Sequence, residues 1–253
     1  MKQAVITEVW AHRGASAYQP ENSIQAFELA IALGADGIEL DVHLSEDGKL
    51  VVTHDENVKR LTGVDRLIAT MTYNEIQKLN FAETIGITER VRAPLLEDVL
   101  DLLKYLSLKL NIELKNDSCA YDQLEERALA AVRQVNMEDR VIFSSFNHRS
   151  MQKMRALNTT ARTGLLFAKP IWKPWELAIR LRAQAIHPFY WNLLIPGYVK
   201  NATHAGIEIN TWTVNTVKDI RFALRKGCRA VITNYPDVAI SEREAIQLNQ
   251  MEG

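Results

Sequence analysis

Cysteine is scarce in the 253-residue sequence, which contains only Cys119 and Cys228. The two lie far apart and have no partners at zinc or redox spacing, so we expect reduced thiols, as in a cytoplasmic protein. No apolar run approaches the ~20 residues of a membrane span. The first ten residues include Lys2 and Glu8 and lack the apolar core of a signal peptide. Stable membrane association is therefore not expected.

An excess of charge of one sign is also missing, because 30 basic and 31 acidic residues give a formal net charge of −1. A near-neutral chain gives no support for general binding to nucleic acid or membranes. The sequence has no P-loop, no G-x-G-x-x-G and no G-x-S-x-G motif, which disfavours nucleotide binding through those motifs and serine hydrolysis. With 47% hydrophobic residues, the chain can bury a sizeable core.

What the sequence does contain is a regular alternation of strand and helix patterns. Strands are predicted over 4–11, 37–44, 109–115, 141–146, 161–167, 185–190, 207–214 and 230–233, with helices between them. Eight such units in about 250 residues predict a single (β/α)8 barrel domain, a TIM barrel, over residues 1–253. An open doubly wound sheet is the alternative. The long connection over 55–94 predicts an insertion after strand two that lies over the barrel mouth.

Acidic residues stand at the ends of two neighbouring predicted strands. Glu39 and Asp41 alternate along one strand and share a face, and Glu113 lies near the end of the next barrel strand. Three carboxylates at one barrel mouth suit one divalent cation, Mg²⁺ or Ca²⁺. Two alternatives remain open: the first pair lies on a solvated strand face, or Glu113 forms an ion pair with Lys115.

Two histidines fall on the same predicted rim. His12 follows the first strand, and His54 ends the short apolar run 50–53. Their unperturbed pKa near neutrality suits a general acid and a general base, although surface or capping positions are the alternative. Arg13 and Lys115 offer charges for a phosphate group, and a structural salt bridge is the alternative for Arg13. Together, these residues predict hydrolysis of a phosphoester.

Aromatic residues at strand ends predict a pocket beside this chemistry. Phe146 and Trp212 could wall a site for a small polyol, and His187 ends a strand that points at the mouth. His43 lies near a turn, and we interpret it as a rim residue and not as a ligand. The remaining histidines, His148 and His204, are interpreted as surface residues of helices.

A set of ordered motifs resembles the glycerophosphodiester phosphodiesterase family. They are H-R-G-A, P-E-N-S, E-L-D-V-H-L-S-E-D-G, V-V-T-H-D, I-E-L-K, T-W-T-V-N and the T-N-Y-P at 233–236. The resemblance covers nearly the whole chain and is of the compact bacterial cytosolic type. It implies a (β/α)8 barrel with a small insertion after strand two. It also implies an enzyme that splits glycerophosphodiesters into sn-glycerol 3-phosphate and an alcohol.

The same resemblance implies roles for individual residues. It implies that His12 and His54 are the acid/base pair, and that Glu39, Asp41 and Glu113 are the metal ligands. It also implies that Arg13 and Lys115 contact the phosphate, and that the pocket is lined by Phe146, His187 and Trp212. One departure is Asn234, where many members have Asp. The alternatives are a lysophospholipase D-like enzyme, which would need an exposed apolar mouth, and a non-catalytic phosphate-ester binding barrel. A homo-oligomer is compatible with the sequence.

Overall fold

The computed structural model describes residues 6–85, 87 and 89–251, so residues 4–5 of the first predicted strand lie outside it. Within these ranges, eight parallel strands form a closed barrel, because β1 pairs with both β2 and β9. The barrel strands are β1 (Glu8–His12), β2 (Gly37–Leu44), β4 (Lys109–Leu114), β5 (Val141–Ser145), β6 (Arg162–Phe167), β7 (Ala185–Pro188), β8 (Glu208–Thr211) and β9 (Ala230–Thr233). The predicted TIM barrel is therefore confirmed, and the open sheet is wrong.

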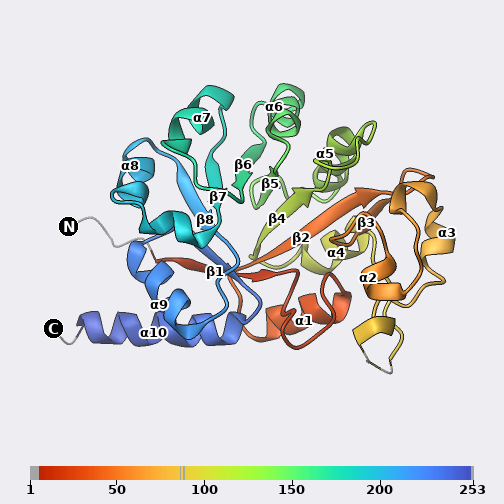
Figure 1. The fold of residues 1–253 in the computed structure, drawn as a ribbon, viewed down its shortest axis with the longest axis horizontal. Helices are drawn as coiled ribbons and strands as arrows, with labels where there is room; N and C mark the ends of the chain where they lie inside the picture. Colours follow the sequence, from red (N-terminus) through yellow and green to blue (C-terminus); the bar gives the residue numbers. More distant parts are fainter. Residues whose placement is uncertain (1–5, 86, 88, 252–253) are drawn as a thin grey trace.

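Helices surround the barrel strands in chain order (Figure 1). They are α1 (Ile24–Ala32), α4 (Leu96–Leu103), α5 (Leu124–Gln134), α6 (His148–Leu157), α7 (Pro174–Leu181), α8 (Tyr198–His204), α9 (Val217–Lys226) and α10 (Pro236–Met251). The main apolar core, which includes Val42, Phe143 and Leu165, packs between strands and helices. A second cluster, which includes Trp10 and Ile142, contains the alternate strand residues, whose side chains point to the opposite face, inside the barrel. Other inward positions, among them Glu39, Asn111 and His187, are polar and line a cavity.

The insertion begins at a short strand, β3 (Leu50–Val52), which pairs antiparallel with the end of β2. Four short helices follow: α2 (Lys59–Thr62), η1 (Ile68–Thr70), α3 (Tyr73–Ile76) and η2 (Glu83–Ile85). They bury a cluster of their own around Val51, Ile68 and Ile76, and they lie at one side of the barrel, next to β3 (Figure 1). His54 stands where the chain leaves β3 for this insertion. In the part of the chain that the structure describes, no helix has the length and apolar character needed to cross a membrane.

Candidate active site

Three carboxylates meet at the carboxyl ends of β2 and β4. The alternation of side chains along β2 turns Glu39 and Asp41 to the same side, and the sheet register places Glu113 opposite Asp41. One oxygen from each of the three carboxylates lies within 4.8 Å of the others, and all three side chains are buried. The interpretation of a solvated strand face is therefore wrong for Glu39 and Asp41.

Burial and mutual repulsion disturb these carboxyls strongly. Burial raises the pKa of Glu39 well above its usual value, and Asp41 and Glu113 raise it further. Burial also raises the pKa of Glu113, although Lys115 opposes the rise. Burial alone would raise the pKa of Asp41, but the charges of Arg13 and Lys115 outweigh it and hold this pKa far below its normal value. A hard divalent cation fits this donor set, because the ligands are all oxygens and a cation would relieve their repulsion.

Each of the two histidines holds its Nδ1 atom against a side-chain oxygen. His12 Nδ1 donates to Asn234 Oδ1 at 2.7 Å, and His54 Nδ1 donates to Asp55 Oδ1 at 2.6 Å. In both rings, Nε2 is therefore the nitrogen available for proton transfer. The Nε2 of His12 lies 3.9 Å from Glu39 Oε2. Burial lowers the pKa of His12 to about 4, so this imidazole is neutral at pH 7.

The cationic side chains of the site contact its carboxylates. Arg13 Nε lies 3.3 Å from Asp41 Oδ2, and Arg13 Nη1 donates to Glu21 Oε1 at 3.0 Å. Lys115 Nζ donates to Glu113 Oε1 at 2.9 Å and lies 3.8 Å from Asp41 Oδ1. The ion pairs left open as alternatives are thus present. They do not remove the two cations from the site, because both line the same cavity as the histidines.

That cavity, here called the lumen cavity, has a volume of about 50 Å³. Phe146 and Trp212 line it with their rings edge to face and their centroids 5.7 Å apart. His187 lines it too and is fully buried, and Asn210 Nδ2 donates to its Nε2 at 3.0 Å. Gly164 leaves room for this imidazole, because a Cβ there would overlap it. The three residues predicted for the pocket therefore share one cavity with both histidines.

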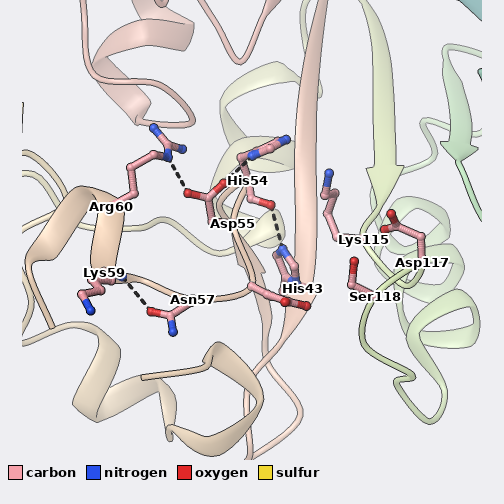
Figure 2. A pocket seen from close by; sticks show the side chains of 10 residues that line it. His43, His54, Asp55, Asn57, Lys59, Arg60, Lys115, Asp117 and Ser118 are labelled. Carbon is pink, nitrogen blue, oxygen red and sulfur yellow. Dashed lines mark hydrogen bonds and ion pairs between the residues drawn. The ribbon is translucent and has the colours of Figure 1, made fainter. Parts of the chain in front are cut away.

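A larger cavity of about 660 Å³, here called the outer cavity, also contains His54 and Lys115 in its wall. Figure 2 shows its two sides, with residues of the insertion such as Asp55 and Arg60 facing Asp117, which follows β4. Arg60 pairs with Asp55 and Glu21, so much of the charge on the insertion side is already neutralised. His54 lies between the two cavities, whereas His12 lines the lumen cavity.

Two histidines are less exposed than the sequence suggests. His43 lines the outer cavity at the rim, but its side chain is buried under Tyr121 and the start of the insertion. Its Nε2 donates to the carbonyl oxygen of His54 at 3.0 Å, and its Nδ1 accepts from Tyr121 Oη at 2.8 Å. His148 is half-buried, since its ring packs on Phe167 and bonds to a backbone carbonyl of β6. Only His204 is exposed as predicted.

Three side chains that hold this site together were not predicted from the sequence. Asn22 Nδ2 donates to Asp41 Oδ2 at 2.9 Å, Asn234 anchors His12, and Asn210 anchors His187. The signal for Asn22 was its place in P-E-N-S, where Asn tolerates the left-handed backbone it adopts, with a φ of 56°. From the sequence, either Asn22 or Ser23 can cap the helix that follows; in the structure the cap is Ser23, whose side chain accepts from Ala26 N.

Comparison with known proteins decides which family has this geometry. The chain matches the glycerophosphoryl diester phosphodiesterase family over residues 12–238. A glycerophosphodiester phosphodiesterase of Caldanaerobacter subterraneus subsp. tengcongensis is 39% identical to it, over 93% of this chain and 97% of the relative. The chain belongs to the glycerophosphoryl diester phosphodiesterase family. The family and the kind of enzyme predicted from the motifs are confirmed.

Solved structures of phosphodiesterases share the barrel. A glycerophosphodiester phosphodiesterase from Agrobacterium tumefaciens superposes with a TM-score of 0.81 at 27% identity, covering 93% of this chain and 99% of that chain. An Oleispira antarctica phosphodiesterase, solved in complex with the product sn-glycerol-3-phosphate, superposes with a TM-score of 0.80 at 25% identity. That match covers 94% of this chain and 97% of that chain. The family fold therefore extends over nearly the entire chain.

Proposed function

We propose that this family member hydrolyses glycerophosphodiesters to sn-glycerol 3-phosphate and an alcohol, with one divalent cation, Mg²⁺ or Ca²⁺, and two catalytic histidines. The observation that carries the proposal is the convergence of two imidazoles on one lumen cavity, next to a cluster of three buried carboxylates. The product bound by the Oleispira antarctica relative supports the same substrate class. Glu39, Asp41 and Glu113 would hold the cation, which when bound would polarise the phosphoryl group.

The two cavities suggest how the diester lies. The glycerol half would occupy the lumen cavity against Phe146, Trp212 and His187, which enclose a small space. The phosphate would then lie next to Arg13 and Lys115, whose donors match its oxygens. The alcohol half would extend into the outer cavity, which shares Lys115 and His54 with the lumen cavity.

The environments of the histidines favour different proton-transfer roles. His12 is neutral at pH 7, because burial lowers its pKa to about 4, and its Nε2 can accept the proton of the attacking hydroxyl or water. His54 Nδ1 donates a hydrogen bond to the Asp55 carboxylate, which leaves Nε2 as the nitrogen that can give a proton. His54 also faces the cavity into which the alcohol would leave, so it is placed to protonate the leaving oxygen.

The test is release of sn-glycerol 3-phosphate from a panel of glycerophosphodiesters with different head groups. Wild-type protein should show turnover that EDTA abolishes and that added Mg²⁺ or Ca²⁺ restores. His12→Ala and His54→Ala should each lose roughly 10²–10⁴-fold in kcat, because general acid–base catalysis contributes that much. Glu113→Gln should require a higher cation concentration for half-maximal rate.

The matched control is His204→Ala, which removes an exposed imidazole of α8 far along the chain from either catalytic segment. It should keep wild-type turnover, and all variants should keep the wild-type circular dichroism spectrum. Near-normal turnover by folded His12→Ala would contradict the mechanism, and turnover unaffected by EDTA would contradict the cation. The single-domain organisation, the cytoplasmic location and a homo-oligomeric state stay predictions.

A further inference from the structure

His43 connects the strand that carries two of the carboxylates to the segment that carries His54. Side chains alternate along β2, so His43 points to the same side as Glu39 and Asp41. Its imidazole is only 2% exposed, and its Nε2 donates to the backbone carbonyl oxygen of His54 at 3.0 Å (Figure 2). Because a carbonyl oxygen can only accept, this bond requires a proton on Nε2 of His43.

The backbone at His54 has little other support. The ladder between β2 and β3 ends at Val52, and one further bond, from Thr53 N to Asp41 O at 3.1 Å, follows it. Among the residues that the structure describes, no second hydrogen bond reaches the carbonyl oxygen of His54. The side chain of His43 therefore holds the backbone from which the His54 imidazole projects.

Tyr121 holds the other nitrogen of His43. It lies between β4 and α5, and its hydroxyl donates to Nδ1 of His43 at 2.8 Å. The two rings meet edge to face, with their centroids 5.8 Å apart. An Nδ1 that accepts leaves the proton on Nε2, so Tyr121 selects the tautomer that can donate to His54. Both polar atoms of this buried ring are thus satisfied, and both bonds favour one orientation.

The other contacts of His54 cannot replace this one. Asp55 holds Nδ1 of His54, but it is the next residue of the same segment and moves with it. Arg60 pairs Asp55 with Glu21 of the segment between β1 and α1, but Arg60 is 46% exposed, and ion pairs at such positions are weakened by solvent. The contact from His43 is the buried one, and it comes from the strand that carries the carboxylates.

We propose that His43, held by Tyr121, is a positioning residue for the general acid, because it keeps His54 at a fixed place relative to Asp41 and Glu39. The inference rests on the proposed function, in which His54 protonates the leaving oxygen. One rigid strand then carries both the proposed metal ligands and the group that locates the acid. Misplacing a reacting group by about 1 Å can cost roughly 10²-fold in rate. The loss should appear in kcat, and only for alcohols that need a proton to leave.

The experiment compares two diesters of glycerol 3-phosphate that differ in the leaving group. Ethanolamine needs a proton on its departing oxygen, whereas p-nitrophenolate leaves as a stable anion without one. His43→Leu should lower kcat about 10- to 100-fold for glycerophosphoethanolamine with little change in KM, and less than about threefold for the p-nitrophenyl diester. Because both rates are measured on one sample, their ratio does not depend on how much of the variant is folded.

Three further variants separate positioning from packing. His43→Gln keeps a donor for the His54 carbonyl and an acceptor for Tyr121, so it should recover most of the lost rate. Tyr121→Phe removes only the hydroxyl and should show the same dependence on the leaving group with a smaller loss. Adding His43→Leu to His54→Ala should cost less than about a further twofold, because the group that His43 positions is already gone.

The matched control is His148→Leu, the same substitution at an imidazole whose Nε2 also bonds to a backbone carbonyl, that of Leu166. Any loss there should be equal for the two diesters. Equal losses of His43→Leu on both diesters, or additive losses with His54→Ala, would overturn the inference and leave the proposed function standing. Wild-type turnover of glycerophosphoethanolamine by folded His54→Ala would instead overturn the proposed role of His54, and the inference with it.

Discussion

At the scale of single residues, the two histidines differ in the acceptor that holds them. An amide oxygen holds His12 and a carboxylate holds His54. Both acceptors fix the Nδ1–H tautomer, which leaves Nε2 of each ring for proton transfer. Asn234 therefore fixes the orientation of His12, and burial, which lowers its pKa to about 4, keeps the ring neutral at pH 7. This is the state that a proton acceptor needs.

Asn234→Ala tests the orienting role. The variant should lower kcat about tenfold or more with little change in KM, because His12 keeps its position in β1 but loses the partner that fixes its tautomer. Steady-state kinetics on glycerophosphoethanolamine measures the effect. Asn215→Ala serves as a comparison, since Asn215 bonds to the backbone of Asn234 and not to the imidazole. Equal losses in the two variants would show that the loop, and not the hydrogen bond to His12, determines the rate.

The sequence was enough to predict that the reactive residues lie close together, but it did not predict which amide side chains surround them. Histidines and carboxylates at strand ends stand out, because charged groups rarely lie in a barrel interior without a reason. Asn22 and Asn210 are uncharged and do not stand out in this way, since asparagine is common in turns and caps. Only the three-dimensional structure shows that their amide groups face Asp41 and His187.

At the scale of elements, the segment between β1 and α1 shows how backbone conformation sets the site. Arg13 and Asn22 both adopt left-handed φ values, of 57° and 56°. Asn22 N donates to Arg13 O at 3.0 Å, and Arg13 N donates to Glu39 O at 2.9 Å. The loop is thereby closed on itself and attached to β2. Its end is fixed by Ser23, the N-cap of α1.

Ser23→Ala should lower the free energy of unfolding by about 1–2 kcal/mol, because the hydroxyl accepts from Ala26 N and also donates to Pro20 O. Urea denaturation measures the change. Ser241→Ala on the exposed face of α10 is the control and should stay within about 0.5 kcal/mol of wild type. A cap that contributes nothing would leave the two variants equally stable.

Element boundaries were predictable where pattern and hydrogen bonding agree. The observed β2 and β9 have the bounds predicted from the sequence, because apolar runs end there at polar or turn residues. The strand predicted over 207–214 is shorter, ending at Thr211. Its β-branched pattern continues, but Trp212 turns its ring into the lumen cavity and its indole Nε1 donates to His187 O at 2.7 Å. Beyond Thr211 only an isolated bridge between Trp212 and Phe189 continues the pairing.

At the scale of the whole molecule, the alternation of strands and helices was enough to predict the barrel, since eight units close into one sheet. Within the insertion, the sequence predicts one short helix, over 73–79, and the structure has α3 there. The other helices of the insertion were not predictable, because they span only three or four residues and show no full helical period. The insertion is held together by tertiary packing, in a small apolar cluster around Ile68 and Ile76. Its position determines where His54 stands.

The stability of the whole molecule should depend on pH through its buried imidazoles. Burial lowers the pKa of His187 to about 3, so the native state stays unprotonated while the unfolded chain takes up a proton near pH 6.5. Below pH 6.5 the unfolded state therefore binds more protons, and stability falls as the pH is lowered. For this group alone, the loss between pH 7 and pH 5 is about 2 kcal/mol.

Urea titrations at pH 7, 6 and 5, in EDTA, measure this dependence. His187→Asn should be less stable than wild type at pH 7, because it leaves space in the lumen, but its stability should fall less on acidification. The difference between the two proteins should narrow by about 2 kcal/mol at pH 5. Parallel curves would show that His187 is protonated in the native state as readily as in the unfolded one.

The hydrogen bond between His12 and Asn234 joins the first barrel strand to the segment that follows the last one. During translation, the carboxylates, both imidazoles and the cationic side chains of the site are therefore made long before Asn234, the residue that orients the His12 imidazole. Until β9 has been translated, β1 lacks its second neighbour and the barrel stays open. Under the proposed mechanism, nascent and prematurely terminated chains thus carry the reactive groups without their arrangement, and we expect activity only when synthesis has passed the final strand.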